Sequence, residues 1–337
     1  LVPALFYGTT PGGLPMTLAI GHEFMLGSYL GAPLAFWLGE IAFRLGGLFA
    51  VYVLAQACIV TAFWAVFTLG RAVVGTRHAV LGILLMAGIA VFAVPSPEFG
   101  PAVLAAPFWA LALLHYWRAV GQSQRGAWFL LALDLGLLLL TSYIGLILLV
   151  LLIVFTPITR RGRRTLLYPE PWLGLALFAI VVFPHAAWLA GARDFIISEF
   201  NAASVATGKL SAGIWLCIAL VAVHLGLALL VALASGWPRR KRERAPEIDR
   251  PPVESFARLY VYFFALAPAA VAVVLAFASE RLWTFGSLAA LSPLVLLSGL
   301  AAIVAAGDRV LLYREGMVST SWLALLVAPP ALVVVSL

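Results

Sequence analysis

The sequence predicts an all-α, polytopic integral membrane protein: a bundle of about 10–11 transmembrane helices with one further helix along the outer membrane interface. Of its 337 residues, 64% are hydrophobic and only 10% are charged, against about 45–50% and about 25% in an ordinary soluble domain. The mean hydropathy is +1.08, and the apolar residues form runs near the roughly 20 residues that cross a bilayer. Cys58 and Cys217 both lie in apolar runs, so no disulfide framework or thiolate metal site is expected.

Each predicted span is an apolar run bounded by charges, glycines or prolines. The predicted spans are residues 48–69, 79–94, 101–117, 127–141, 144–158, 171–190, 213–234, 257–278, 285–305 and 317–336. The apolar stretch from Leu1 to Tyr7 resembles the end of another span, and the chain starts with Leu. We therefore expect a single transmembrane domain, 1–337, that is truncated at its N-terminus and possibly at its C-terminus.

The region from Ala127 to Ile158 is long for one span and short for two. A hinge at Thr141-Ser142-Tyr143 would divide it into two crossings. With two crossings, the basic run at 160–164 falls on the same side as the other strongly basic loops, whereas one crossing would place it opposite them. The charge distribution therefore favours two crossings.

The charges are divided unequally between the two faces. With these spans, 17 of the 21 basic residues and seven of the 14 acidic ones lie at one face, and four basic and six acidic residues lie at the other. The net charges are +10 and −2, so the positive-inside rule makes the first face cytoplasmic. The excess of positive charge thus reflects membrane topology and gives no reason to expect nucleic-acid binding. The basic segment 235–256 is predicted to be a solvated cytoplasmic linker that contacts membrane lipids.

Two long loops carry most of the charge of the outer face. They span residues 14–47 and 191–212, and long loops that are not linkers tend to hold function. In the first loop, Glu40 and Arg44 are spaced i, i+4 among apolar residues that include Trp37. This pattern predicts an interfacial helix with the tryptophan at headgroup depth.

The first candidate site is His22-Glu23 in the first outer loop. A carboxylate beside an imidazole is suited to general-base catalysis or to holding a divalent cation. The alternative is a solvated pair of loop residues without a catalytic role.

The second candidate is Glu98, which lies among Pro95, Pro97 and Pro101 in a very short outer connection. Because prolines stiffen the backbone, this carboxylate is expected to be held where two spans emerge. The alternative is a carboxylate that stabilises the N-terminus of the next helix, and the two roles are compatible.

The third candidate group is His185, near the outer end of its span, with Arg193 and Lys209 in the loop that follows. These three residues are candidates for binding the phosphate of the sugar donor at the membrane surface, and the alternative is that they are ordinary loop residues. Within the spans, we expect Asp134 to make a helix–helix hydrogen bond, although an intramembrane acid is by default a functional candidate. His115 and His224 are expected to be structural.

Three segments resemble the polyprenyl-phosphate-sugar-dependent membrane glycosyltransferases of the GT-C class, specifically the protein-mannosyltransferase and aminoarabinose-transferase group. Residues 27–38, which include Tyr29, resemble that family's Gly-Tyr-Tyr-x-(Lys/His)-Pro-Pro-Leu-x-x-Trp-Leu segment. Residues 138–145, with Ser142 and Tyr143, resemble its Leu-Thr-Lys-Tyr-x-Gly turn, and residues 183–189 are similar to its Phe-Pro-His-Leu-x-Trp-Leu segment.

The resemblance implies a GT-C-like fold and the inverting transfer of a sugar from a polyprenyl-phosphate carrier to a lipid, glycan or protein acceptor. It places the active site on the periplasmic face of the bacterial inner membrane, with Glu98 at the position of the family's second-loop acid. The first-loop Asp-Glu of the family falls near Gly13-Leu14, where there is no acid, and Ser142 replaces the turn lysine.

These departures leave three interpretations open. In the first, Glu23 and Glu98 share the acid role of an active transferase that modifies lipid A, another envelope glycan or protein. In the second, the chain is a catalytically silent protein with the same fold. In the third, it is a transporter or lipid flippase that uses Asp134.

Overall fold

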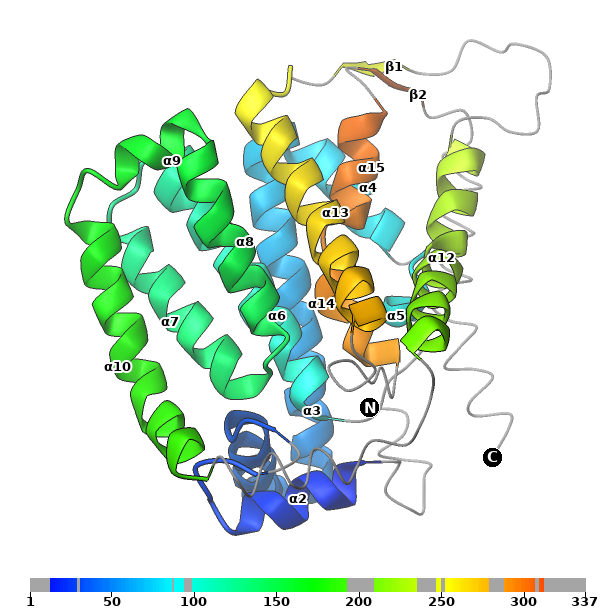
Figure 1. Ribbon diagram of the computed structural model, residues 1–337. Helices are drawn as coiled ribbons and strands as arrows, with labels where there is room; N and C mark the ends of the chain where they lie inside the picture. Colours follow the sequence, from blue (N-terminus) through cyan, green and yellow to red (C-terminus); the bar gives the residue numbers. More distant parts are fainter. Residues whose placement is uncertain are drawn as a thin grey trace, which may run out of the picture.

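A computed structural model describes residues 13–28, 31–86, 88–93, 99–192, 209–234, 247–249, 252–278, 288–306 and 309–311. The long helices run between two ends of the molecule (Figure 1). The helices are α2 Leu14–His22, α3 Leu34–Val74, α4 Thr76–Met86, α5 Ala90–Ala93, α6 Pro101–Tyr116 with the π turn η1 Trp117–Gly121, α7 Ala127–Thr141, α8 Gly145–Ile158, α9 Arg160–Thr165, α10 Glu170–Gly191, α12 Lys209–Ala234, α13 Ser255–Ala278, the 3₁₀ turn η3 Leu288–Leu291, α14 Ser292–Val295 and α15 Ser298–Ala305.

The predicted helical membrane protein is confirmed. Within the described residues, five helical segments are long and apolar enough to cross a membrane: Leu34–Val74, Pro101–Gly121, Glu170–Gly191, Ala212–Ala232 and Ser255–Phe277. Four shorter apolar segments accompany them: Thr76–Met86, Ala127–Thr141, Gly145–Ile158 and Ser292–Ala305. The predicted span 317–336 lies outside the described residues.

The two crossings predicted within 127–158 are present as α7 and α8, joined by a turn at one end of the molecule. Ser142 ends α7 with an extended backbone, and its hydroxyl accepts a hydrogen bond from the Ile144 amide at 3.4 Å. At Gly145, an added Cβ would lie 2.7 Å from Cγ of Leu138, so the first turn of α8 has no room for a side chain there. The turn is therefore tight because a glycine follows the hinge.

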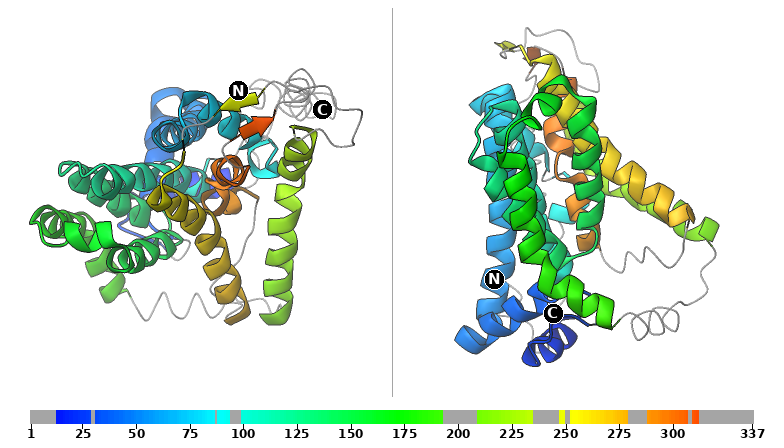
Figure 2. Two further views of the ribbon diagram at one scale, coloured as in Figure 1. Left: turned by 90° about the horizontal axis from the view of Figure 1, so that it is seen from above. Right: turned by 60° about the vertical axis from the view of Figure 1, so that its left-hand side comes forward.

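The predicted interfacial helix is the first part of α3. Gly46 and Gly47 have non-helical backbone angles, with φ of 62° at Gly47, a value that glycine adopts without strain. The break separates residues 34–45 from the long membrane-crossing part of α3, and the first part turns away across the end of the bundle (Figure 2, right). Two glycines thus produce the change of direction.

Two predicted spans are interrupted rather than continuous, which corrects the prediction. In the span 79–94, α4 ends at Met86 and the short α5 follows, and in 285–305 the described helix is divided into η3, α14 and α15. At Gly88, an added Cβ would lie 2.8 Å from the carbonyl carbon of Gly226. Because the backbone of α12 passes this close, the interruption is a property of the packing between helices.

The core is centred on α6, which is buried along nearly its whole length and packs against α3 and α7. Tyr116 of α6 meets an aromatic group formed by Phe155 of α8 with Tyr260 and Phe264 of α13. A second, smaller cluster joins α2 and the first part of α3 to the start of α6, and it includes Leu14, Ala35, Phe99 and Val103. The smaller cluster fixes the interfacial helix on the bundle.

Most arginines of the described ranges gather at one end of the bundle, as the topology predicted, and Arg44 lies at the other end. Arg71 and Arg118 line one cavity there, and Arg125, Arg161 and Arg164 line another. We call this the basic end and the opposite one, with α2 and the α7–α8 turn, the outer end. Near the basic end, β1 Glu247–Asp249 pairs antiparallel with β2 Arg309–Leu311, so the segment predicted as a linker contains a short strand.

Candidate functional site at the outer end

His185 of α10 joins three segments at the outer end. Its side chain is 4% exposed. One ring nitrogen, Nδ1, lies 2.6 Å from the carbonyl oxygen of Leu26, and the other, Nε2, lies 3.0 Å from the hydroxyl of Tyr143. A carbonyl can only accept, so Nδ1 carries the hydrogen. His185 therefore holds the outer loop before α3 and the α7–α8 turn on α10.

The Tyr143 hydroxyl completes this arrangement. In a neutral imidazole with the hydrogen on Nδ1, Nε2 is an acceptor, so Tyr143 donates to it. Burial raises the pKa of Tyr143 above its ordinary value, which keeps the phenol protonated as the donor. The Tyr143 ring stacks on His185 and the residue as a whole is 41% exposed. His185 thus fixes the hydroxyl of a tyrosine that is itself partly exposed at the outer end.

The loop that contains Leu26 has two further attachments. The indole nitrogen of Trp37, on the interfacial helix, donates to the carbonyl of Met25 at 2.9 Å. Gly27 lies against Trp188 of α10 so closely that an added Cβ would be 2.4 Å from the indole ring. Trp188 in turn stacks on His185. The loop is therefore held between α3 and α10 by two hydrogen bonds and one close packing contact.

These contacts unite the three segments whose motifs resemble the glycosyltransferase family. Gly27 and Trp37 belong to the first, Tyr143 to the second, and His185 with Trp188 to the third. The hydrogen bond from His185 to Leu26 spans 159 residues of sequence. Motifs that are far apart along the chain thus meet at one place in the fold.

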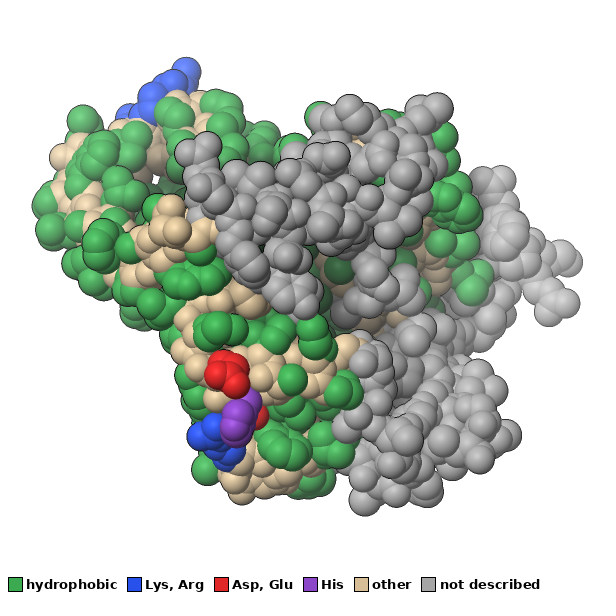
Figure 3. Space-filling model, turned by 60° about the horizontal axis from the view of Figure 1, so that its bottom comes forward, with side chains coloured by type: hydrophobic (Ala, Val, Ile, Leu, Met, Phe, Trp, Pro, Cys, Tyr) green, Lys and Arg blue, Asp and Glu red, His purple; other side chains and the backbone are tan. Residues whose placement is uncertain are grey.

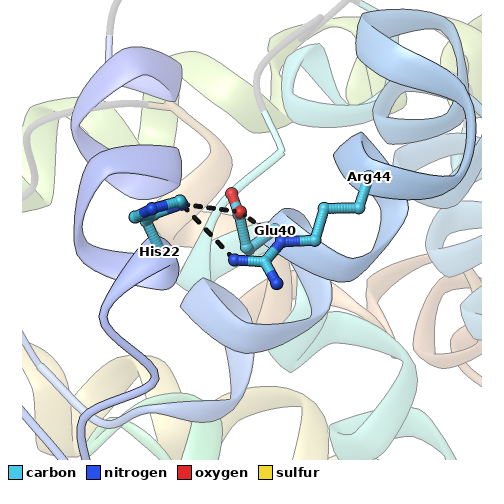
Figure 4. Close-up of polar contacts among 3 residues, drawn as sticks. All are labelled: His22, Glu40 and Arg44. Carbon is cyan, nitrogen blue, oxygen red and sulfur yellow. Dashed lines mark hydrogen bonds and ion pairs between the residues drawn. The ribbon is translucent and has the colours of Figure 1, made fainter.

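A second polar cluster lies beside the first and consists of His22, Glu40 and Arg44 (Figure 4). Nε of Arg44 donates to Oε1 of Glu40 at 2.7 Å, and Nδ1 of His22 lies 3.1 Å from the same oxygen. Nδ1 also lies 3.4 Å from Nη2 of Arg44. Because one ring nitrogen cannot both donate and accept, the His22 tautomer selects between a bond to Glu40 and a bond from Arg44.

Glu40 is the buried member of this cluster. Its side chain is 6% exposed, against 69% for His22 and 52% for Arg44. The hydrogen bond from Arg44 holds the pKa of Glu40 below its ordinary value, although burial opposes the shift. Figure 3 shows acidic, basic and histidine side chains gathered on an otherwise mostly hydrophobic described surface. Glu40 is therefore an ionised carboxylate that joins α2 to the interfacial helix.

The close approach of α2 to α3 explains this contact. At Gly21, an added Cβ would lie 2.3 Å from the carbonyl oxygen of Phe36 and 2.9 Å from Cβ of Glu40. Only a residue without a side chain permits this separation, and His22 follows directly. Gly21 thus brings the imidazole to Glu40.

The other predicted site residues are placed as follows. Glu23 is exposed just after α2 and lies next to His22 in sequence. Ser142 is half-buried in the α7–α8 turn. The side chains of Glu98, Tyr29, Arg193 and Lys209 lie outside the described residues, although the backbone of Lys209 opens α12.

The segment that follows Glu98 is anchored at this end. Phe99 is 1% exposed, and its ring lies 3.3 Å from where a Cβ on Gly39 of the interfacial helix would be. Phe99 therefore packs one residue away from Glu40, next to the small core cluster.

No group of three or more histidine, cysteine, aspartate or glutamate side chains is placed to hold a metal ion within the described ranges. His22 contacts Glu40 and Arg44. Arg44 is itself a cation bound to Glu40, so these described neighbours do not complete a metal site with His22 and Glu23. The metal-binding interpretation of His22-Glu23 thus gains no additional ligand.

Sequence reasoning missed two contacts at this end. It found the Glu40–Arg44 spacing, but it did not predict that His22 would reach Glu40, because the 18-residue separation is bridged only by the packing of α2 on α3. It also singled out His185 without its backbone partner, Leu26. No local sequence signal specifies either contact.

The histidines inside the bundle make the structural contacts that were predicted. His115 Nδ1 lies 2.5 Å from Oδ2 of Asp134, which joins α6 to α7, and Asp134 is 7% exposed. His224 Nε2 lies 2.9 Å from the hydroxyl of Ser298. Asp134 thus makes the helix–helix hydrogen bond that was expected of it.

Residues 31–188 match the family model described as dolichyl-phosphate-mannose-protein mannosyltransferase. The predicted family resemblance is confirmed. The matched segment contains α3 through most of α10, so it includes Glu40, Tyr143 and His185. No curated protein matches the chain.

Two solved structures share the fold, both of ArnT from Cupriavidus metallidurans. The chain is 15% identical to each. The apo structure matches with a TM-score of 0.57 over 88% of this chain, and the structure bound to undecaprenyl phosphate matches with 0.58 over 93%. The chain spans only 55% and 58% of the length of those structures. At this identity the likeness establishes the GT-C-like fold.

Proposed function

We propose that this protein transfers a sugar from a polyprenyl-phosphate carrier to a lipid, glycan or protein acceptor, with inversion, at the outer end of the bundle. The single observation that carries the proposal is the convergence of the three family-like segments on His185. The family match over 31–188 and the undecaprenyl phosphate bound to the structural neighbour support a carrier of this class. The proposed setting is the bacterial inner membrane, with the outer end facing the periplasm.

The proposed reaction needs little covalent chemistry from the protein. The acceptor hydroxyl oxygen attacks the anomeric carbon from the face opposite the phosphate, the bond from that carbon to the phosphate oxygen breaks, and a carboxylate takes the hydroxyl proton. A general base contributes about 10²–10⁴-fold, and cations stabilise the charge that develops on the departing phosphate. One displacement at the anomeric carbon gives inversion.

We assign the base to Glu98, with Glu23 as a second carboxylate that shares the acid role. Glu98 directly precedes Phe99, which packs against the interfacial helix. Arg193 and Lys209 are proposed to bind the phosphate, as expected from their place in the loop after α10 and at the start of α12. His22, Tyr29 and Ser142 are secondary candidates for the proposed site.

His185 takes a positioning role in this scheme. Both of its ring nitrogens are engaged, and only 4% of the residue is exposed. In place of the phosphate contact expected from the sequence, it positions the α7–α8 turn at Tyr143 and the loop at Leu26. Tyr143 gives its single hydroxyl hydrogen to His185, so its oxygen is left as an acceptor.

The test measures sugar transfer by the full chain in nanodiscs with a polyprenyl-phosphate sugar. Glu98→Gln should lower turnover about 100-fold or more because the general base is lost, while Glu243→Gln, in the basic linker, should leave it unchanged. His185→Phe keeps the stacking ring and removes both hydrogen bonds, so it should lower turnover more than Tyr143→Phe does. Unchanged turnover in Glu98→Gln would remove the proposed base.

Two alternatives make different predictions. A catalytically silent protein with this fold would bind no sugar donor and give no transferred sugar. A flippase would show proton-coupled lipid flux in proteoliposomes that Asp134→Asn stops, yet the described contacts of Asp134 join two helices. The structure thus gives Asp134 a structural partner and gives the outer end the family-like groups.

A further inference from the structure

An apolar cavity and a polar cavity adjoin each other near the basic end. Each has a volume of about 440 Å³, and Trp128 of α7 lines both. Along the chain, Thr165 and Glu170 line the polar cavity, while Leu166 and Pro171 line the apolar one. The two cavities therefore form one amphipathic site.

The apolar cavity has the properties of an acyl-chain site. Its walls are aliphatic and aromatic side chains of α7, α8 and α10, among them Leu135, Leu152 and Phe178. Two further lining residues, Ile153 and Leu175, are more than half exposed. Because apolar side chains exposed on the helices of a membrane protein face lipid tails, this cavity is open to the hydrocarbon of the bilayer.

The polar cavity carries an excess of positive charge. It is lined by Arg125, Arg161 and Arg164, and Glu170 is the one acid among its described lining residues. A second carboxylate, that of Glu254, pairs with Arg161 but does not line the cavity. Three guanidiniums against two carboxylates leave one positive charge unbalanced among the residues that the structure describes.

Arg164 is the arginine whose guanidinium is available to a ligand. The side chain of Arg161 is held by Glu254, and Nη1 of Arg125 lies 3.5 Å from Oε1 of Glu170. Arg164 is exposed on α9 and makes no side-chain hydrogen bond or ion pair with any residue of the described ranges. The unbalanced charge is therefore assigned to Arg164.

Neither carboxylate is free to receive a cationic headgroup. Glu170 offers Oε1 to Arg125, and its Oε2 is buried with almost no accessible surface. Glu254 is engaged by Arg161 outside the cavity lining. An ammonium group in this cavity would therefore meet guanidiniums and no accessible carboxylate of the described residues, an unfavourable contact between like charges.

We propose that this site binds phosphatidylglycerol, a membrane lipid whose headgroup has one negative charge and no amine. Its phosphodiester pairs with the guanidinium of Arg164, and one acyl chain occupies the apolar cavity. The single charge of the phosphodiester balances the one unbalanced arginine. Basic pockets between transmembrane helices on the cytoplasmic side suit anionic headgroups, and Trp128, which lines both cavities, suits the boundary between headgroup and hydrocarbon.

The charges of the cavity separate phosphatidylglycerol from two other phospholipids. Phosphatidylethanolamine brings the same phosphodiester together with an ammonium group, which the arginines of the cavity repel. Cardiolipin brings two phosphodiesters, whereas one lining arginine is without a partner among the described residues. A lipid with a single negative charge is therefore the best match.

The test is native mass spectrometry of the full chain titrated in detergent with phosphatidylglycerol, phosphatidylethanolamine and cardiolipin. We expect phosphatidylglycerol to be retained about tenfold more strongly than phosphatidylethanolamine, because no repelled ammonium offsets its charge-assisted bond to Arg164. Arg164→Ala should lower retention of phosphatidylglycerol about tenfold. Arg160→Ala is the matched control, because Arg160 is exposed on α9 but does not line the cavity, and it should leave retention unchanged.

A second pair of variants tests the acyl-chain part of the site. Ala132 of α7 lines the apolar cavity, so Ala132→Leu should fill part of it. Retention of phosphatidylglycerol should then fall about fourfold, the loss expected when one methylene is kept out of the cavity. Ala57→Leu makes the same change at an exposed position of α3 that lines neither cavity, and it should have no effect.

Several outcomes would overturn the proposal. These are equal retention of phosphatidylglycerol and phosphatidylethanolamine, tighter retention of cardiolipin, full retention by Arg164→Ala, and full retention by a folded Ala132→Leu. Displacement by inorganic phosphate alone would show a free-phosphate site instead, and displacement by polyprenyl phosphate that depends on Arg164 would assign the site to the carrier. Because Arg164 is exposed, its substitution decides the question even if Ala132→Leu does not fold. None of these results bears on sugar transfer at the outer end.

Discussion

The two ends of the bundle use their polar side chains differently. At the outer end, His185 and Glu40 each contact two other groups, and these contacts fix the backbone of the loop before α3 and the position of α2. At the basic end, Arg164 lacks a partner among the described residues and lines a cavity. The outer end is thus a rigid support, whereas the basic end retains a cation for a ligand.

This difference implies that substitutions that crowd the packing equally at the two ends should affect sugar transfer differently. A disturbance at the outer end should move the segments that carry the proposed chemistry. A disturbance of similar size at the basic end should affect stability and leave the chemistry intact. Glycines with tight surroundings occur at both ends and allow the comparison.

The largest effect is expected for Gly27→Leu. A Cβ at this position would lie 2.4 Å from the Trp188 ring, so the loop must move off α10 and lose the contact between Leu26 and His185. Overpacking of this kind costs about 1–3 kcal/mol. Because displacing a site by about 1 Å can cost about 100-fold in rate, turnover per folded molecule should fall by that order.

The control for this substitution is Gly13→Leu. An added Cβ at Gly13 meets nothing within 4 Å, although the residue directly precedes α2 at the same end. It should leave both turnover and the thermal midpoint unchanged. If Gly27→Leu transferred sugar at the normal rate, the support role of the outer loop would be wrong.

A smaller effect, on stability alone, is expected for Gly162→Ala at the basic end. Its Cβ would lie 2.1 Å from the carbonyl oxygen of Thr156 and 2.8 Å from Oγ1 of Thr159. The α8–α9 corner must shift, at a cost of about 1–3 kcal/mol, measured as a lower thermal midpoint in detergent. Sugar transfer per folded molecule should stay within about twofold, since a twofold change is under about 0.5 kcal/mol.

A matched control exists for this position as well. Gly126, just before α7 at the same end, has open space around its Cβ position, so Gly126→Ala should alter neither property. A loss of turnover in Gly162→Ala that exceeds its loss of folded protein would show that the two ends are mechanically coupled, contrary to the comparison.

The elements that the sequence predicted are those specified by local pattern. Apolar length located the spans, the distribution of arginines divided 127–158 into two crossings, and the i, i+4 spacing identified the Glu40–Arg44 pair. These patterns depend on residues a few positions apart or on the solvent that surrounds a whole segment. The sequence therefore predicts these elements even when the packing between helices is unknown.

The features that the sequence did not predict depend on packing between distant segments. The interruption near Gly88 follows from the close passage of Gly226, and the His185 contact links residues 159 positions apart. The arginines of 160–164 were interpreted as a topology signal, and only the fold shows that Arg164 and Glu170 share a cavity. The motifs gave the right segments, but not the contacts between them.

The smallest effect is expected for Glu40→Gln. It concerns how the thermal stability contributed by an ion pair at each end depends on pH. The pKa of Glu40 is lowered in the folded protein from an ordinary value of 4.5, first by the hydrogen bond from Arg44. Its contribution to stability is therefore complete above pH 4.5 and is lost as the pH falls through the lower folded-state pKa. Because Arg44 is half exposed, the contribution is under about 1 kcal/mol.

Thermal unfolding in detergent between pH 7 and pH 3 measures this contribution. The midpoint of the unsubstituted protein should fall below pH 4.5 more steeply than that of Glu40→Gln, which has no carboxyl to protonate at this position. Glu254→Gln at the basic end is the comparison, since Glu254 and its partner Arg161 have side chains that are 54% and 39% exposed. That substitution should change the acid slope less, because water already screens the pair. Identical acid slopes for the unsubstituted protein and Glu40→Gln would mean that the buried carboxylate does not hold α2 on the interfacial helix.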